Sequence, residues 1–218
     1  MYRVNNDYIN TDDFIVRRID SKIAAQIVIR YHYLHRRPQI LFAFGLIRKI
    51  DRKIIGCCTF GNPASPMVCK GICGEQEADK VIELNRLVIN DLSGKNAESF
   101  LVGKALRELK KLTDKDIVVS YADSQQRHIG YIYQACNFLY TGMSAKHRDY
   151  KNKDGESIHP RHFEERNDKH SDSVIYSERS RKFRYIYFNC SKARKRYLLK
   201  ILRYSILEYP KDWSLMNV

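Results

Sequence analysis

The stretch SYADSQQRHIGYIYQACNFLYTG, residues 120–142, follows an apolar β-branched run at residues 117–119 and places an acid and a histidine soon after it. Such a run is typical of a buried strand, and the residues from Tyr131 onward have the pattern of a helix. Asp123 and His128 then fall past the carboxyl end of the strand, where open α/β sheets bind ligands. The stretch predicts a strand, a ligand-binding rim and a helix.

The polar residues of this stretch also have plainer explanations. Asp123 can cap the following helix, His128 can be a surface residue at a helix start, and Tyr133 can pack in the core. Their joint occurrence within one short span favours a functional site over these separate explanations. The candidates are Tyr121, Asp123, His128, Tyr131 and Tyr133.

The surrounding segments predict an α/β fold with a mixed central β-sheet and flanking helices. Asp20 and Ser21 are typical of a helix N-cap, and Pro38 disfavours helical geometry just before it. The Pro- and Gly-containing stretch 62–79 is expected to be a loop. The expected elements are a helix over 21–34, an antiparallel hairpin of strands over 41–47 and 53–61, a strand over 80–89, a helix over 99–112, and a strand from Phe138.

The chain divides by composition into three parts. Residues 1–142 form the predicted α/β core, and residues 143–182 are polar and charge-dense, which indicates an insertion or long loop. Residues 183–218 return to a strand and a basic amphipathic helix, which we expect to pack as an extension on the same domain. The sequence shows no internal repeat.

The charge of the chain points to a polyanionic partner. Its formal net charge is +14 with an isoelectric point near 9.5, which favours nucleic acid first and an anionic membrane second, with a generally basic surface as the alternative. From 179 to 203 the chain has no acidic residue. The cations expected to hold phosphates there are Lys192, Arg194, Lys195, Arg196, Lys200 and Arg203.

Membrane insertion and secretion are not expected. No apolar run approaches the roughly 20 residues that a membrane span needs, and the N-terminus lacks the charged-then-apolar order of a signal peptide. The six cysteines include an adjacent pair, Cys57 and Cys58, and do not resemble a disulfide framework. A reducing cytoplasm is therefore the expected location. Cys69 and Cys73 have metal-ligand spacing, but no second pair lies nearby.

The strand over 80–89 carries charges among apolar residues. Strict alternation would place Arg86 with Ile82 and Leu84 on one face and Glu83 on the other. Burying a charge is costly unless it is paired or used. A solvent-facing edge strand is one interpretation, and an Arg86 that faces a negative or carbonyl group in a cleft is the other.

Two further segments carry candidate residues. His32 and His35 in YHYLHRRP are three positions apart near a helix end and can share a face. They suit acid–base work, substrate positioning or ordinary packing, and a metal would need ligands from elsewhere. Gly94 and Lys95 precede the helix over 99–112, and free N–H groups at such a turn attract phosphates. No Walker pattern is present.

The segments YHYLHRRP, ELNRLVI, NAESFLVGKAL, residues 120–142 and the distal RKFRYIYF…YPK together resemble the Mom family of bacteriophage DNA-modification proteins. The resemblance covers about residues 20–211 and implies an acyltransferase (GNAT)-like fold. It also implies transfer of a carbamoylmethyl (acetamido) group to adenine N6, which shields phage DNA from host restriction. The residues that it marks are His32, Tyr33, Arg86, Ser99, Asp123 and Tyr133.

The donor of the transferred group is not specified by the sequence. Acyltransferases of this fold usually carry a Gln/Arg-x-x-Gly-x-Gly/Ala loop for the pyrophosphate of coenzyme A, whereas the corresponding segment here reads SGKNAESFL. A coenzyme A thioester therefore stays only a candidate. We expect Gly94, Lys95 and Ser99 to be the cofactor-binding positions.

The residues support a limited mechanism. Adenine N6 is a weak nucleophile, so Asp123 or His32 would act as its base while Arg86 and tyrosine hydroxyls stabilise charge on the donor. Tyr33 or Tyr133 would stack on an adenine extruded from the duplex. Two other functions remain open. An N-acetyltransferase of proteins or small amines would bind coenzyme A without DNA, and a non-catalytic nucleic-acid-binding protein would not depend on Asp123.

Overall fold

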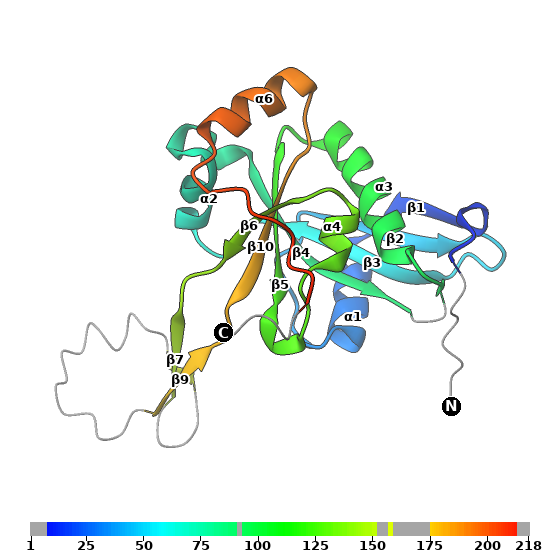
Figure 1. The fold of residues 1–218 in the computed structure, drawn as a ribbon. Helices are drawn as coiled ribbons and strands as arrows, with labels where there is room; N and C mark the ends of the chain where they lie inside the picture. The colour runs from blue at the N-terminus through cyan, green and yellow to red at the C-terminus, as the bar shows by residue number, and fades with distance from the viewer. Residues whose placement is uncertain (1–7, 91–92, 152–156, 159–174, 213–218) are drawn as a thin grey trace.

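A seven-stranded sheet in the order β1-β2-β3-β4-β5-β10-β6 runs through the protein (Figure 1). The computed structural model describes residues 8–90, 93–151, 157–158 and 175–212. Its strands are β1 Phe14–Arg18, β2 Phe42–Arg48, β3 Ile54–Gly61, β4 Val81–Ile89, β5 Ile117–Asp123, β6 Leu139–Met143, β7 His147–Lys151, β8 Ser157–Ile158, β9 Ile175–Arg179 and β10 Lys182–Phe188. Its α-helices are α1 Ser21–Tyr31, α2 Pro66–Cys73, α3 Ala97–Leu112, α4 Tyr131–Ala135 and α6 Lys192–Ile201, and its short 3-10 helices are η1 Thr11–Asp13, η2 Glu75–Lys80 and η4 Ser124–Gln126.

The sheet is of mixed direction, as the sequence predicts. Its neighbouring strands pair antiparallel except β4 and β5, which are parallel. The expected hairpin is present as β2 and β3. Within the last part of the sequence, β10 inserts between β5 and β6. The strands β8, β7 and β9 form a separate sheet that projects away from the main one (Figure 1).

Helices cover both faces of the seven-stranded sheet. The apolar stripe of α3, which includes Leu101 and Ala105, packs on Phe44 and Phe60 of β2 and β3. On the opposite face α1 buries Ala24 and Val28 against β2 and β3. Farther along that face, α2 and α6 pack together over β5 and β10 (Figure 1). Burying each large apolar side chain contributes about 1.5–3 kcal/mol to folding.

Strands β4 and β5 stay paired over only a short distance. Their register joins Val81–Glu83 of β4 to Ile117–Val119 of β5. Beyond that point β4 pairs only with β3, and β5 pairs only with β10. The two parallel strands therefore separate, and their carboxyl-terminal halves form the two sides of a cleft within the sheet.

The prediction that side chains alternate strictly between the two faces of the strand along residues 82–89 is wrong beyond Leu84. A β-bulge lies at Asn85, because Arg86 faces Thr59 while Leu84 faces Phe60, the next residue of β3. Leu87 and Ile89 therefore join Ile82 and Leu84 in the core beneath α3. Arg86 lies with Val88 on the other face. The extra residue reverses the side-chain pattern, which a strict two-residue repeat cannot anticipate.

Other boundaries also differ from the prediction. The first helix ends at Tyr31, since His32 is extended and its N–H closes on the carbonyl of Val28. The stretch 62–79 is largely helical, because Ser65 caps α2 and Pro66 occupies its first turn. Strand β1 has no counterpart in the prediction. Of the predicted insertion, 152–156 and 159–174 lie outside the described residues.

Candidate active site

A cavity of about 810 Å³ occupies the separation between β4 and β5. It is lined from both faces of the sheet: Tyr133 packs with the core beneath α3, whereas Tyr121 packs with the core beneath α2 and α6. All five predicted catalytic residues line it, namely His32, Tyr33, Arg86, Asp123 and Tyr133. Residues distant in sequence thus converge on a space of the size that holds a nucleobase and a small donor.

Arg86 carries a donor without a partner. The bulge residue Asn85 is held in place because its Oδ1 accepts a hydrogen bond from Thr59 Oγ1 (2.6 Å) and its Nδ2 donates to the carbonyl of Gln39 (2.9 Å). One nitrogen of the Arg86 guanidinium, Nη1, donates to the carbonyl of Asn85 (2.6 Å). The Nε of Arg86 is buried and has no acceptor among the described residues. Burial also lowers the pKa of Arg86. A ligand oxygen in the cavity would satisfy this donor.

Asp123 combines the capping role with a place in the cavity wall. Its Oδ1 accepts hydrogen bonds from the Gln125 N–H (3.0 Å) and from Ser180 Oγ (2.7 Å). Its Oδ2 lies 3.7 Å from Lys182 Nζ. The side chain is 9% exposed. These contacts fix the carboxylate at the end of β5, and Oδ2 is the oxygen with fewer partners.

His32 presents a hydrogen-bond donor to the cavity. Its Nδ1 accepts from the Leu34 N–H (3.1 Å), so the proton of the neutral ring is on Nε2. Burial, and next the charge of Arg86, lower the pKa of His32 to about 4, which keeps the ring neutral. In this form Nε2 donates and has no lone pair to accept a proton. The expectation that His32 serves as a base is therefore less well supported than the expectation for Asp123.

The two predicted tyrosines occupy different environments. Tyr33 stacks on His32 with ring centroids 4.3 Å apart, and its side chain remains 44% exposed. Tyr133 packs its ring against Tyr185 (5.3 Å) and Phe138 (5.5 Å). Burial raises the pKa of Tyr133 to about 12, so its hydroxyl stays protonated. Of the two, Tyr33 has the freer ring for stacking, and Tyr133 offers its hydroxyl.

Several cavity residues were not selected from the sequence. Glu83 lies where β4 and β5 part, and burial raises the pKa of its carboxyl. The sequence signal that could have identified Glu83 as a cavity residue was its charge within an otherwise apolar strand. Glu98, Ser180 and Lys182 also line the cavity. Ser180 and Lys182 lie in the polar stretch 143–182, where no periodicity indicates which side chains turn inward.

The predicted cofactor-binding residues lie apart from this cavity. Ser99 lines a second cavity of about 560 Å³ beside α3 and α4, and its hydroxyl donates to the carbonyl of Asn96 (3.1 Å). The carbonyl of Lys95 accepts from the Ile9 N–H (2.9 Å), and Gly94 forms part of the same turn with φ 88°. Beside this turn, Glu98 in the first turn of α3 does line the larger cavity.

Arg194, one of the predicted phosphate-binding residues, forms ion pairs within the protein. The Arg194 guanidinium donates from Nε to Asp116 Oδ2 (2.9 Å) and from Nη1 to Glu77 Oε1 (2.8 Å), while Nη2 contacts Glu77 Oε2. Arg194 therefore ties α6 to η2 and to the start of β5 and has little left to offer a phosphate. The sequence could not show this, because Glu77 is 117 positions away. Lys192, Arg196, Lys200 and Arg203 are exposed, and Lys195 is half-buried.

The described residues hold no cluster of three or more His, Cys, Asp or Glu side chains suited to a metal. His35 is turned back toward helix α1, where its Nδ1 donates to the carbonyl of Ile29 (2.9 Å). Cys69 and Cys73 both belong to α2. Among the described helices, none has the length and apolar character of a membrane span.

Comparison with solved structures returns N-acetyltransferases. The chain is similar to an N-acetyltransferase from Staphylococcus aureus Mu50, with 13% identity, coverage of 81% of this chain and 99% of that chain, and a TM-score of 0.47. It is also similar to the IAA acetyltransferase from Bacillus cereus ATCC 14579, with 13% identity, coverage of 80% and 99%, and a TM-score of 0.47. At this level of similarity neither match identifies a reaction.

Comparison with known sequences is more specific. The methylcarbamoylase Mom of Escherichia phage Mu is 27% identical over 146 residues, which are 66% of this chain and 59% of that protein. The match thus spans about three fifths of the relative's length. The sequence model of the Mom protein family matches residues 13–211. The chain belongs to the Mom protein family.

Proposed function

We propose that this protein is a DNA-modifying transferase that places a carbamoylmethyl (acetamido) group on adenine N6 of phage DNA, in the cytoplasm of the bacterial host. The modified base would resist host restriction enzymes. Membership in the Mom family and the name of the phage Mu relative support the reaction class. The observation that carries the proposal is the buried Nε of Arg86, which has no partner among the described residues, on the wall of a cavity lined from both faces of the sheet.

The cavity offers complementary groups for this transfer. As N6 attacks the donor, it forms the new N–C bond and loses one proton, while the donor's leaving group departs with its bonding electrons. Asp123 is the proposed acceptor of that proton through Oδ2. Arg86 Nε and His32 Nε2 are donors that would hold an oxygen of the donor molecule as negative charge develops.

The adenine would have to leave the duplex to reach these groups. Its amino group lies in the major groove but is stacked within the helix, so the enzyme would extrude the base into a pocket. Tyr33 would stack on it, because its ring is exposed and already packs on the ring of His32. The exposed cations of α6 would add to the positive field that attracts the duplex.

The test is mass spectrometry of nucleosides from DNA that was co-expressed with the protein. We expect a modified deoxyadenosine that carries one added acetamide unit, and none from cells that express Arg86→Ala. Unmodified DNA together with acetylated protein or amine would support the N-acetyltransferase alternative. Unmodified DNA, no acyl product and intact duplex binding would support a non-catalytic binding protein.

A further inference from the structure

Two long segments of sequence that contribute to the lining of the large cavity contain no acidic residue. No Asp or Glu lies between Asp20 and Asp51, or between Asp123 and Asp149. The first interval supplies the cavity wall from Tyr31 to Leu34, and the second supplies it from His128 to Tyr133. The acids of the site, including Asp123, lie within the cavity wall.

The first of these segments carries two adjacent arginines just after its cavity-lining residues. Arg36 and Arg37 follow the cavity residue Leu34 by two and three positions, and both are exposed. Neither forms an ion pair with a residue that the structure describes. This contrasts with Arg194 of α6, whose guanidinium is held by two carboxylates. The charges of Arg36 and Arg37 are thus available to a polyanion.

Exposed tyrosines accompany these cations. Tyr31 is 62% exposed and Tyr131 is 64% exposed, and both line the cavity. The Arg30 guanidinium lies 5.2 Å from the centroid of the Tyr31 ring. Cations interleaved with exposed aromatic rings are the pattern by which proteins hold phosphates and unstacked bases together. We name this surface the rim, composed of Arg30, Tyr31, Tyr33, Arg36, Arg37 and Tyr131.

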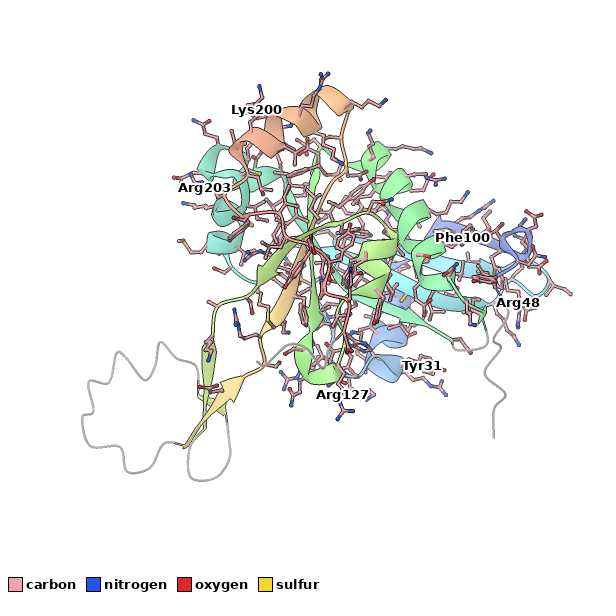
Figure 2. The ribbon with its side chains drawn as sticks, viewed as in Figure 1. Tyr31, Arg48, Phe100, Arg127, Lys200 and Arg203 are labelled. Carbon is pink, nitrogen blue, oxygen red and sulfur yellow. The ribbon has the colours of Figure 1, made fainter. Side chains whose placement is uncertain are left out.

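Tyr31 of the rim and the basic helix α6 lie at opposite ends of the protein. In Figure 2, Tyr31 and Arg127 lie at one end, whereas Lys200 and Arg203 lie at the other. The helix α6 is also anchored on α2, where the Cys73 thiol contacts the carbonyl of Leu198 (3.9 Å). A duplex that delivers an adenine into the cavity must approach beside exposed residues of its lining, and Tyr31, Tyr33 and Tyr131 of the rim are such residues.

We propose that the rim is the docking surface for double-stranded DNA, with phosphates beside the target adenine bound by Arg36 and Arg37. This rests on the proposed function for the choice of duplex DNA as partner. The arginines set the position of the backbone, and exposed Tyr31 lies against the opening that the extruded base leaves. The cations of α6 contribute long-range attraction and no close phosphate contact.

The test compares three double variants that each remove two exposed positive charges. They are Arg36→Gln/Arg37→Gln at the rim, Lys192→Gln/Arg196→Gln on α6, and Lys49→Gln/Arg52→Gln at the turn between β2 and β3 as the control for total charge. The dissociation constant for one duplex is measured against salt concentration, and circular dichroism confirms the fold. For the rim variant we expect the log–log slope to fall by roughly two units. We expect the other two variants to keep slopes close to the parent's.

A parental slope in the rim variant, or an equal loss in the α6 variant, would overturn the docking surface. Nucleoside analysis of the parent separates this result from the proposed reaction. If the parent modifies DNA but the binding does not depend on Arg36 and Arg37, only the proposal of the rim as the docking surface is rejected. Unmodified DNA with binding that depends on them rejects only the reaction.

Discussion

The hydroxyl of Ser120 donates a hydrogen bond of 2.8 Å to the carbonyl of Leu84, one residue past the last paired positions of β4 and β5. Both residues are buried, and the bond lies where the two strands begin to separate and the cavity begins. Burial raises the pKa of Tyr133, and the neighbouring Ser120 side chain partly offsets this effect. One small polar side chain therefore links the two strands beside a residue of the cavity wall.

Ser120→Ala should lower stability because it leaves the buried carbonyl of Leu84 without a donor. The expected loss in the free energy of unfolding is about 1–3 kcal/mol. Ser99→Ala is the matched control, since the Ser99 hydroxyl bonds to the carbonyl of Asn96 at an exposed position. Urea denaturation measures both. If both variants lost the same free energy of unfolding, the buried bond of Ser120 would contribute no more to stability than the exposed bond of Ser99.

Arg86→Lys should lose modification activity and keep its affinity for duplex DNA. Lysine retains a charge but has no Nε donor and no planar fork, so a ligand oxygen at that position goes unbound. A lost hydrogen bond from a charged group predicts at least about a tenfold loss in rate. Arg48→Lys, whose partner Asp51 lies in the β2–β3 turn, is the control for the exchange itself. Near-parental turnover in Arg86→Lys would reduce Arg86 to a general electrostatic role.

Asp123→Asn should separate the cap from the chemistry. Asparagine keeps an Oδ1 that accepts from the Gln125 N–H and from Ser180, but it removes the charge near Lys182. We expect loss of modification with a stability change under about 1 kcal/mol. Asp123→Ala should also abolish modification, leave the protein folded and lose the cap energy in addition. Nucleoside analysis and urea denaturation report the two effects, and parental modification in Asp123→Asn would show that this carboxylate is not the base.

The sequence predicted the elements that local pattern determines. The hairpin of β2 and β3, the strand β4, the helix α3 and the order of strand, turn and helix at residues 117–135 follow from periodicity and caps. The convergence of Arg86 and Asp123 on one cavity also follows, because both lie near the carboxyl ends of neighbouring parallel strands.

Features that depend on distant partners were missed. The bulge at Asn85 is stabilised by Thr59 and Gln39, and the pairing of Arg194 depends on Glu77. No local pattern encodes such contacts. The same holds for Ser180 and Lys182, which reach the cavity because β10 pairs beside β5 at Asp123.

Arg194→Gln should destabilise the fold and leave phosphate binding nearly unchanged. Glu77 is only 7% exposed and would lose its partner, which predicts a loss of about 2 kcal/mol or more. The bond from Arg194 lowers the pKa of Glu77, so this stabilisation is present above about pH 4.5 and is lost as pH falls through the folded-state pKa. The difference between parent and variant should therefore shrink in acid. Arg196→Gln, exposed on the same helix, is the control, and equal thermal midpoints for the two variants would contradict the role of Arg194.

The neutral state of His32 sets the expected pH dependence. Its pKa is lowered to about 4 in the folded protein, chiefly by burial, whereas the unfolded chain binds the proton near pH 6.5. The unfolded state therefore gains protons first as pH falls from about 6.5 to about 4, and stability should decline over that window. Because His32 is half-buried, we expect its share to be on the order of 1 kcal/mol after solvent screening.

His32→Gln should remove that decline, since glutamine does not titrate. His128→Gln, at an exposed position of the same cavity, is the matched control and should keep the parental profile. His32 is already neutral at pH 6 and donates from Nε2, so its titration should not make the modification rate fall as the pH drops through 6.5. If the parent does show such a fall (an acid limb of the rate profile), His32→Gln should show it too. Rates from pH 5.5 to 8.5 measure this. A limb near pH 6.5 that is lost only in the His32 variant would mean that the ring titrates in solution and serves as the base, with Asp123 left to hold the end of β5.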